Sequence, residues 1–180
     1  WCLVGSEMCI RDRSYSINEN SVTITGCDTA ASGALVIPDT IASKPVTAIG
    51  YAAFYDCSNL TSITIPASVT SIGNFAFQNC SGLTSVNFGE NSQLTSIGRG
   101  AFYSCASLTS ITIPASVTSI GSYAFLKCTS LTSITIPDSV TSIEVHSFSY
   151  FDSLTAIEVG EGNQNYSSEN GVLFNKDKTI

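Results

Sequence analysis

The stretch LTSITIPASVTSIG at residues 60–73 decides the fold, because close copies of it recur along the chain. The later copies begin, at successive spacings of 23, 25, 23 and 23 residues, at Leu83, Leu108, Leu131 and Leu154. A degenerate earlier copy runs from Leu35 to Cys57. Self-similarity with a period of roughly 20–50 residues is typical of solenoids and other repeat architectures. The sequence therefore predicts one stacked array.

Each copy opens with the pattern of a short strand. Leu60, Ile63 and Ile65 follow the L-x-x-L-x-L spacing of a leucine-rich repeat. Ile63 and Ile65 are two residues apart, which predicts a strand with one buried face and with Thr64 on the solvent side. Pro66 ends this strand, because proline cannot donate a hydrogen bond to a neighbouring strand.

The second half of each copy returns the chain to the core. Val69 and Ile72 fit a second short strand, and Gly73 permits a turn of positive φ. The spacing that follows suits a single helical or 3-10 turn formed by Ala76, Phe77 and Cys80. One copy buries too little apolar surface to offset its loss of conformational entropy, so the copies must stack. Stacking predicts one aromatic column of Phe54, Phe77, Phe102, Phe125 and Phe148.

The whole unit, C-x-x-L-x-x-I-x-I-P-x-x-V-x-x-I-G-x-x-A-F, resembles the BspA-like leucine-rich repeat, also called the Treponema pallidum type. Its hallmarks include Ile65-Pro66 and Ala76-Phe77, and the resemblance covers nearly all of residues 15–180. It implies a repeat solenoid of the α/β leucine-rich class. Such a solenoid is a curved right-handed coil, with short parallel β-strands on the concave side and short helical or 3-10 turns on the convex side.

Two copies depart from this pattern. In the copy that begins at Leu83, Phe88-Gly89 replaces the Ile-Pro pair, and two additional residues within 90–93 should bulge from the coil. In the copy that begins at Leu131, the usual Gly, Ala and Cys are replaced by Glu144, Ser147 and Phe151.

The two ends of the chain differ from the repeats. Residues 1–13 lack the basic and apolar regions of a signal peptide and resemble translated sequencing-adapter read-through, so we expect them to lie outside the fold. The leucine-rich repeat domain is predicted over 14–180, with an opening strand region at 14–34, repeats at about 35–159 and a hairpin-like segment at 160–180. The first residue is Trp1 and the only methionine is Met8, which predicts a missing natural start. Because such hairpins normally precede more repeats in the family, we also expect a truncated C-terminus.

Composition excludes several classes of partner. Only seven Lys and Arg are present and the net charge is −7, whereas a nucleic-acid binder needs a basic surface. The sequence contains no apolar run of about 18 residues and no basic amphipathic helix, so we expect no direct membrane insertion. Charged residues make up 12% of the chain, so its surface must consist mostly of neutral polar side chains.

Two surfaces are candidates for binding. The solvent-facing strand positions should align as polar rows that include Ser62, Thr64, Asn87, Thr112 and Thr135. The turn positions carry aromatic side chains that are typical interface anchors, namely Tyr51, Tyr55, Phe75, Tyr103, Tyr123 and Tyr150. The simpler interpretation is that threonine favours strands and that some of the aromatic side chains only cover the core.

The nucleophilic and titratable residues do not form a catalytic pattern. A second column should contain Cys57, Cys80, Cys105 and Cys128, which we interpret as small buried apolar residues, with oxidised pairs as an alternative. His146 is the only histidine and occupies a variable turn position, where surface placement is the better interpretation. We therefore expect no enzyme activity, no cofactor and no metal site.

These patterns favour macromolecular binding. By the resemblance, the protein is expected at the cell surface or outside the cell, where the face of the solenoid binds a protein or glycan of a host or neighbouring cell. The alternative is a structural spacer that displays another domain. A third possibility is ice or glycan binding by the Ser and Thr rows.

Overall fold

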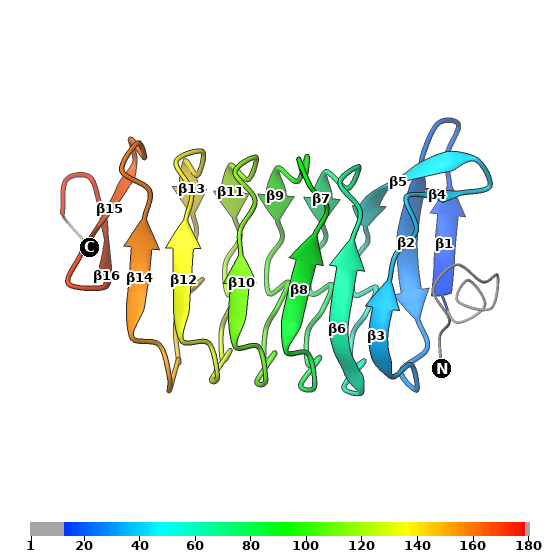
Figure 1. Cartoon of the computed structure of the whole chain (residues 1–180), viewed down its shortest axis with the longest axis horizontal. Helices are drawn as coiled ribbons and strands as arrows, with labels where there is room; N and C mark the ends of the chain where they lie inside the picture. The colour runs from blue at the N-terminus through cyan, green and yellow to red at the C-terminus, as the bar shows by residue number, and fades with distance from the viewer. Residues whose placement is uncertain (1–12, 179–180) are drawn as a thin grey trace.

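The computed structural model describes residues 13–178, which fold into sixteen β-strands joined by turns (Figure 1). Each repeat makes one coil with a strand at the front, as drawn in Figure 1, and a shorter strand behind it. The coils follow one another along the long axis of the molecule, which makes the fold a β-solenoid. Residues 13–178 contain no helix, and so none that could cross a membrane.

The front sheet has six parallel strands in the order β14-β12-β10-β8-β6-β3. Its strands are β3 (Gly33–Val36), β6 (Leu60–Ile65), β8 (Ser85–Phe88), β10 (Ser110–Thr112), β12 (Ser133–Ile136) and β14 (Ala156–Val159). Equivalent residues of successive copies are paired, so that Ile63 lies beside Val86. The predicted alternation is confirmed, because Ile63 and Ile65 are buried and Thr64 lies on the outer face.

The rear sheet has eight strands, seven of them in the order β1-β2-β5-β7-β9-β11-β13, and β4 pairs with β5. They are β1 (Arg13–Ile17), β2 (Val22–Cys27), β4 (Thr40–Ile41), β5 (Lys44–Ile49), β7 (Ser71–Ile72), β9 (Ser96–Ile97), β11 (Ser119–Ile120) and β13 (Ser142–Ile143). The resemblance placed the parallel strands on the concave side alone, and the rear sheet corrects that expectation. The predicted second strand after Val69 forms as β7, and its equivalents pair in register from β5 to β13.

The third side of each coil, which we call the turn side (residues 50–58, 73–81, 98–106, 121–129 and 144–152), is not helical as predicted. Its amide groups alternate between two kinds of partner. Phe77 donates its backbone N–H to the Ala101 carbonyl of the next coil at 2.7 Å, whereas Gln78 donates to Phe75 within its own coil at 3.1 Å. A helix would direct all of its N–H groups along its own axis, leaving none for the neighbouring coil. The turn side therefore forms a third set of bonds between coils.

Left-handed residues make this alternation possible. In the coil of Phe77, Phe75 has a φ of 58° and Asn79 a φ of 61°, and every other coil has two such residues at the same positions. A left-handed residue reverses the local curl of the backbone, so a right-handed helix cannot continue past it. The conformation is costly for residues with a Cβ, and it is tolerated here because neighbouring coils bond on both sides.

The repeated glycine before the turn side has a different role from the predicted one. Gly73 does not have a positive φ. A Cβ added to Gly73 would lie 2.7 Å from the carbonyl carbon of Gly50, and one added to Gly98 would lie 2.7 Å from that of Gly73. Glycine is therefore required because successive coils approach closely at this corner.

The aromatic column that the repeat predicts is confirmed. Its rings are stacked within 9° of parallel, with centroid separations of 5.0, 5.1, 5.4 and 5.6 Å, from Phe54 through Phe77, Phe102 and Phe125 to Phe148. The first four are completely buried. The column joins the leucines and isoleucines of both sheets in one continuous core. Each coil thus supplies part of the core of its neighbour.

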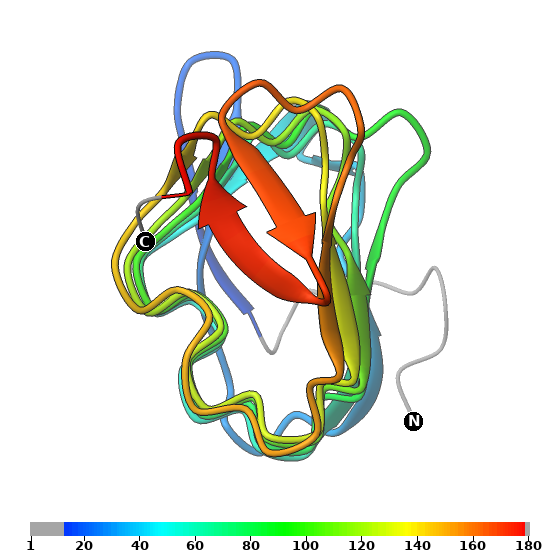
Figure 2. The ribbon, with the colours of Figure 1, turned by 90° about the vertical axis from the view of Figure 1, so that its left-hand side faces the viewer.

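A hairpin of β15 (Tyr166–Glu169) and β16 (Val172–Asn175) lies across the end of the last coil (Figure 2). It occupies hydrogen-bonding groups of both sheets. Ile143 in β13 donates its N–H to the Tyr166 hydroxyl at 2.8 Å, and Ile157 in β14 donates to the Gly171 carbonyl at 2.9 Å. The hairpin therefore takes the place of a further coil at these two points.

The buried side chain of Asn163 fixes the start of this hairpin. Its Nδ2 donates to the carbonyls of Pro137 at 2.9 Å and Val140 at 3.0 Å, and its Oδ1 accepts the N–H groups of Asn165 and Tyr166, both at 2.8 Å. All four hydrogen-bonding sites of the amide are occupied.

The opening segment of the chain reaches the fold at Arg13. This residue begins β1 and pairs with Cys27 of β2, although we expected residues 1–13 to lie outside the fold. The remainder of that expectation, for residues 1–12, concerns a segment that lies outside the described residues.

Candidate binding face

The outer face of the front sheet brings the predicted polar positions together. Thr64 pairs with Asn87, and Thr112 pairs with Thr135, which in turn pairs with Glu158. A second row runs beside them through Ser62, Ser85, Ser110 and Ser133. The predicted residues Ser62, Thr64, Asn87, Thr112 and Thr135 therefore share one surface, which we call the front face together with the other members of the two rows. Their role in binding stays a prediction.

The polar groups of the front face are not used by the fold. Within residues 13–178, the side chains of Ser62, Thr64, Asn87, Thr112 and Thr135 make no hydrogen bond to another residue. Asn87, Thr112 and Thr135 are exposed, and Ser62 and Thr64 are partly exposed. The front face thus presents hydroxyl and amide groups that remain available to a partner.

Other threonines of the repeat are used differently. One row, at the start of the rear strands, runs through Thr47, Thr70, Thr95, Thr118 and Thr141. In it each hydroxyl from Thr70 onward donates to the threonine carbonyl one coil back, at 3.0–3.2 Å. A second row, at the start of the front strands, does the same over 2.8–3.3 Å through Thr61, Thr84, Thr109, Thr132 and Thr155. These two rows, which we call the bonding rows, connect the coils.

Sequence reasoning did not identify the bonding rows, although a signal was present. Threonine recurs without exception at 61, 84, 109, 132 and 155, whereas the outward position at 64, 87, 112, 135 and 158 varies between Thr, Asn and Glu. The unbroken repetition of threonine was the signal for a structural role, although the front-face serines at 62, 85, 110 and 133 show that a repeated residue can also stay unused by the fold.

The predicted aromatic positions lie on the turn side, away from the front face, and form two groups. In the first, Tyr51 meets Phe75 edge-on at 6.0 Å, and Tyr123 stacks on His146 at 5.6 Å. The Arg99 guanidinium lies between the two pairs, 5.8 Å from the Phe75 ring centre and 5.4 Å from that of Tyr123. Glycine is required at position 100, next to Arg99, because a Cβ there would lie 2.6 Å from the Phe75 ring.

In the second group, the Lys127 ammonium lies 5.9 Å from the Tyr103 ring centre. Tyr55 is 43% exposed, while Phe75, Tyr103 and Tyr123 are partly buried. Most of these rings are thus occupied with one another or with a cation, which stabilises the stack of coils. Tyr51 and Tyr150, at 71% and 73% exposed, are the rings of this set with most surface left for a partner.

The cysteine column is part of the core. Cys80, Cys105 and Cys128 donate their thiols to the carbonyls of Phe54, Phe77 and Phe102, at 3.0, 3.1 and 3.2 Å. These three thiols and that of Cys57 are buried and not disulfide-bonded. Burial raises the pKa of Cys80 and Cys128 to about 12 and that of Cys105 well above its ordinary value. Such thiols are protonated and poor nucleophiles.

The remaining titratable groups are dispersed over the surface. Among residues 13–178, His, Cys, Asp and Glu side chains do not gather in groups of three or more that could hold a metal ion. His146 is exposed and stacked on Tyr123. The Glu144 carboxylate accepts the Ser122 hydroxyl at 2.6 Å and its N–H at 3.0 Å, and these bonds lower the Glu144 pKa.

Comparison with known proteins agrees with this geometry. A family model described as the BspA type leucine rich repeat region matches residues 47–175 in six copies. The chain belongs to the BspA-type leucine-rich repeat family. A search of curated protein sequences finds no match.

Several solved structures of leucine-rich repeat proteins are similar. A protein from Treponema pallidum is 30% identical, with a TM-score of 0.77 over 82% of this chain and 68% of its own. One from Bacteroides ovatus is 35% identical, with a TM-score of 0.74 over 81% of this chain and 39% of its own. A leucine rich cell surface protein from Faecalibacterium prausnitzii is 29% identical, with a TM-score of 0.54 over 92% and 57%. The chain thus spans between 39% and 68% of the length of these three proteins.

Proposed function

We propose that this solenoid is the recognition part of a secreted or cell-surface protein and that its front face binds a protein or glycan of another cell. The observation that carries the proposal is the difference between the threonine rows. Hydroxyls of the bonding rows are consumed by neighbouring coils, whereas the polar groups of the front face have no partner within residues 13–178. The cell-surface description of the Faecalibacterium prausnitzii relative supports the location.

The rigidity of the scaffold supports the same role. Strand pairing and turn-side bonds tie each coil to the next, so the front face is held in one arrangement before a partner arrives. A preformed surface loses little conformational entropy on binding, which favours affinity.

The proposal is tested by binding of the purified chain to immobilised matrix proteins and to an oligosaccharide array. A front-face variant with Thr64→Lys, Thr112→Lys and Thr135→Lys adds bulk and charge without removing an internal hydrogen bond. We expect it to weaken binding by about tenfold or more. A matched turn-side variant, with Tyr51→Lys and Tyr150→Lys, should bind as the parent does. Loss of binding in the turn-side variant alone would contradict the proposal.

A structural spacer is the second candidate, favoured by the unbroken bonds between coils along the array. A spacer needs rigidity and no ligand. It predicts that the parent chain retains nothing from the matrix panel or the array. That result would replace the recognition role by the spacer role.

A further inference from the structure

The front face is interrupted at one place, between β8 and β10. The pairing of these strands ends at Val86 and Ile111, whereas β6 and β8 stay paired as far as Ile65 and Phe88. The copy that begins at Leu83 also carries the two additional residues, and its connection after β8 projects from the outline of the other coils (green in Figure 2). A recess of about 520 Å³ lies at this point.

The recess combines neutral polar groups with apolar surface. Asn87 and Asn91 provide amides and Thr112 a hydroxyl, and none of the three side chains has a hydrogen-bond partner within residues 13–178. The apolar lining comes from Phe88, Pro114 and Ala115, among others. A volume of this size falls within the range of roughly 300–1,000 Å³ that is usual for ligand sites.

Hydrogen bonds on both sides hold the recess open. The projecting connection is fixed at its start by the Gly89 N–H, which donates to the Ile65 carbonyl, and at its end by the Gln93 N–H, which donates to the Ala67 carbonyl, both at 2.9 Å. On the far wall, the Ser116 hydroxyl contacts the Ser92 and Leu94 carbonyls at 2.8 and 2.7 Å. The walls are therefore preorganised.

The chemistry of the lining selects among ligands. No lining residue carries a charge, the neighbouring Glu90 is acidic, and the whole chain has a net charge of −7, so an anionic group would find no countercharge. β8 and β10 lie inside the sheet, between β6 and β12, and only the last two residues of β8 are unpaired on the side of β10, too few to hold an added peptide strand.

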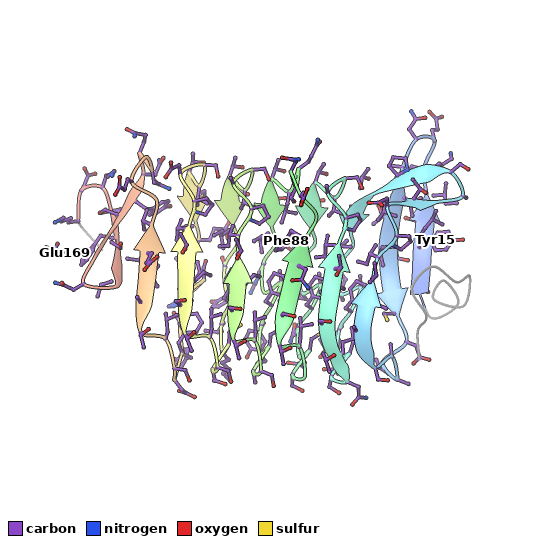
Figure 3. The ribbon with its side chains drawn as sticks, in the orientation of Figure 1. Tyr15, Phe88 and Glu169 are labelled. Carbon is purple, nitrogen blue, oxygen red and sulfur yellow. The ribbon has the colours of Figure 1, made fainter. Side chains whose placement is uncertain are left out.

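We propose that this recess binds a neutral sugar unit of a glycan, an inference that deepens the proposed function and rests on it. The hydroxyls of a neutral pyranose can both donate to and accept from the amides of Asn87 and Asn91 and the hydroxyl of Thr112. Its C–H face fits the apolar lining beside Phe88 (labelled in Figure 3). Affinity for one unit is weak, and the open front face on either side of the recess accommodates the rest of a longer chain.

The test uses an array of neutral and acidic oligosaccharides, followed by calorimetric titration of the neutral oligosaccharide that gives the strongest array signal. We expect Asn87→Ala and Thr112→Val each to weaken its binding by about tenfold, because each removes groups that bond the ligand. Ala115→Trp should abolish binding by filling the recess while removing no polar group. The matched controls Ser58→Ala and Ser81→Ala change exposed serines on the turn side, away from the front face, and should leave the affinity unchanged.

Circular dichroism melting of each variant separates loss of ligand from loss of fold, and the melting temperatures should match the parent. Binding of acidic but not neutral oligosaccharides would overturn the inference, as would equal losses in the control variants. If neutral sugars fail to bind but the parent chain still binds a matrix protein through the front face, the sugar inference fails and the proposed function stands. If the front-face lysine variant also retains that binding, both fail.

Discussion

The bonding rows and the front face both contain threonine, a few positions apart. The hydroxyls of the bonding rows bind the neighbouring coil, whereas those of the front face do not. Thr95 directs both its N–H and its hydroxyl to the Thr70 carbonyl, at 2.8 and 3.0 Å. Thr112 lies on the outer face of β10, and its hydroxyl has no partner among the described residues. The difference is one of direction, because a side chain that points along the stack meets the next coil and one that points away from the sheet meets solvent. In this solenoid, the polar side chains available to a partner are those that do not bond a neighbouring coil.

The largest loss of stability is expected from a substitution in the aromatic column, where the coils share their core. Phe102 lies between Phe77 and Phe125 and is completely buried, so Phe102→Asp places an unpaired carboxylate among stacked rings. We expect a loss of more than about 4 kcal/mol and unfolding of several adjoining coils. The matched control Tyr150→Asp changes an exposed ring. Cooperative melting of the Phe102→Asp variant at the parental temperature would refute the shared core.

The next largest loss of stability is expected at the C-terminal hairpin. Asn163→Ala removes four hydrogen bonds at a completely buried site, two to the Pro137 and Val140 carbonyls and two from the Asn165 and Tyr166 N–H groups. We expect a loss of roughly 2–4 kcal/mol in the stability of the last coil and its hairpin. Limited proteolysis should then cut residues 166–175 first. The exposed control Ser168→Ala should resist as the parent does, and equal resistance of both variants would contradict this role.

The buried cysteine column predicts how the stability of the stacked coils depends on pH. Burial raises the pKa of Cys80 and Cys128 to about 12 in the folded chain, whereas an unfolded thiol has an ordinary pKa of 9.0. The raised pKa means that the unfolded state binds fewer protons between these values, so stability falls as pH rises through this window. The slope is at most about 1.4 kcal/mol per pH unit for each thiol. Denaturant unfolding from pH 8 to 11 should show a flatter decline for Cys80→Ala, and parallel curves would contradict the assignment.

The regular part of the fold could be predicted because each feature repeats. The period, the strand at Leu60–Ile65 and the phenylalanine column all follow from apolar residues at fixed spacing. The turn side could not, because Ala76, Phe77 and Cys80 show the same apolar spacing in a helical turn as in a turn with two left-handed residues. Gly100 in one left-handed column and Asp56 and Asn79 in the other were the available signals, since these residue types tolerate positive φ.

The candidate site was predictable in part for the same reason. The period-two pattern places Thr64 and Asn87 on one face, but spacing alone does not tell which hydroxyls the neighbouring coil uses. The recess beside Phe88 depends on where the pairing of β8 with β10 stops, and only the two additional residues pointed to it. The earlier copies have no asparagine at the position equivalent to Asn163, so the repeat pattern gave no signal for it.

Thr95→Val and Thr112→Val test the central comparison most directly, because the same isosteric change is made in a bonding row and on the front face. Equilibrium urea unfolding should show a loss of about 0.5–1.5 kcal/mol for Thr95→Val, which removes a hydroxyl bond between coils. Thr112→Val should stay within about 0.5 kcal/mol of the parent, as for other surface substitutions. Equal losses in the two variants, or a larger loss for Thr112→Val, would contradict the division between groups that bind the coils and groups left for a partner.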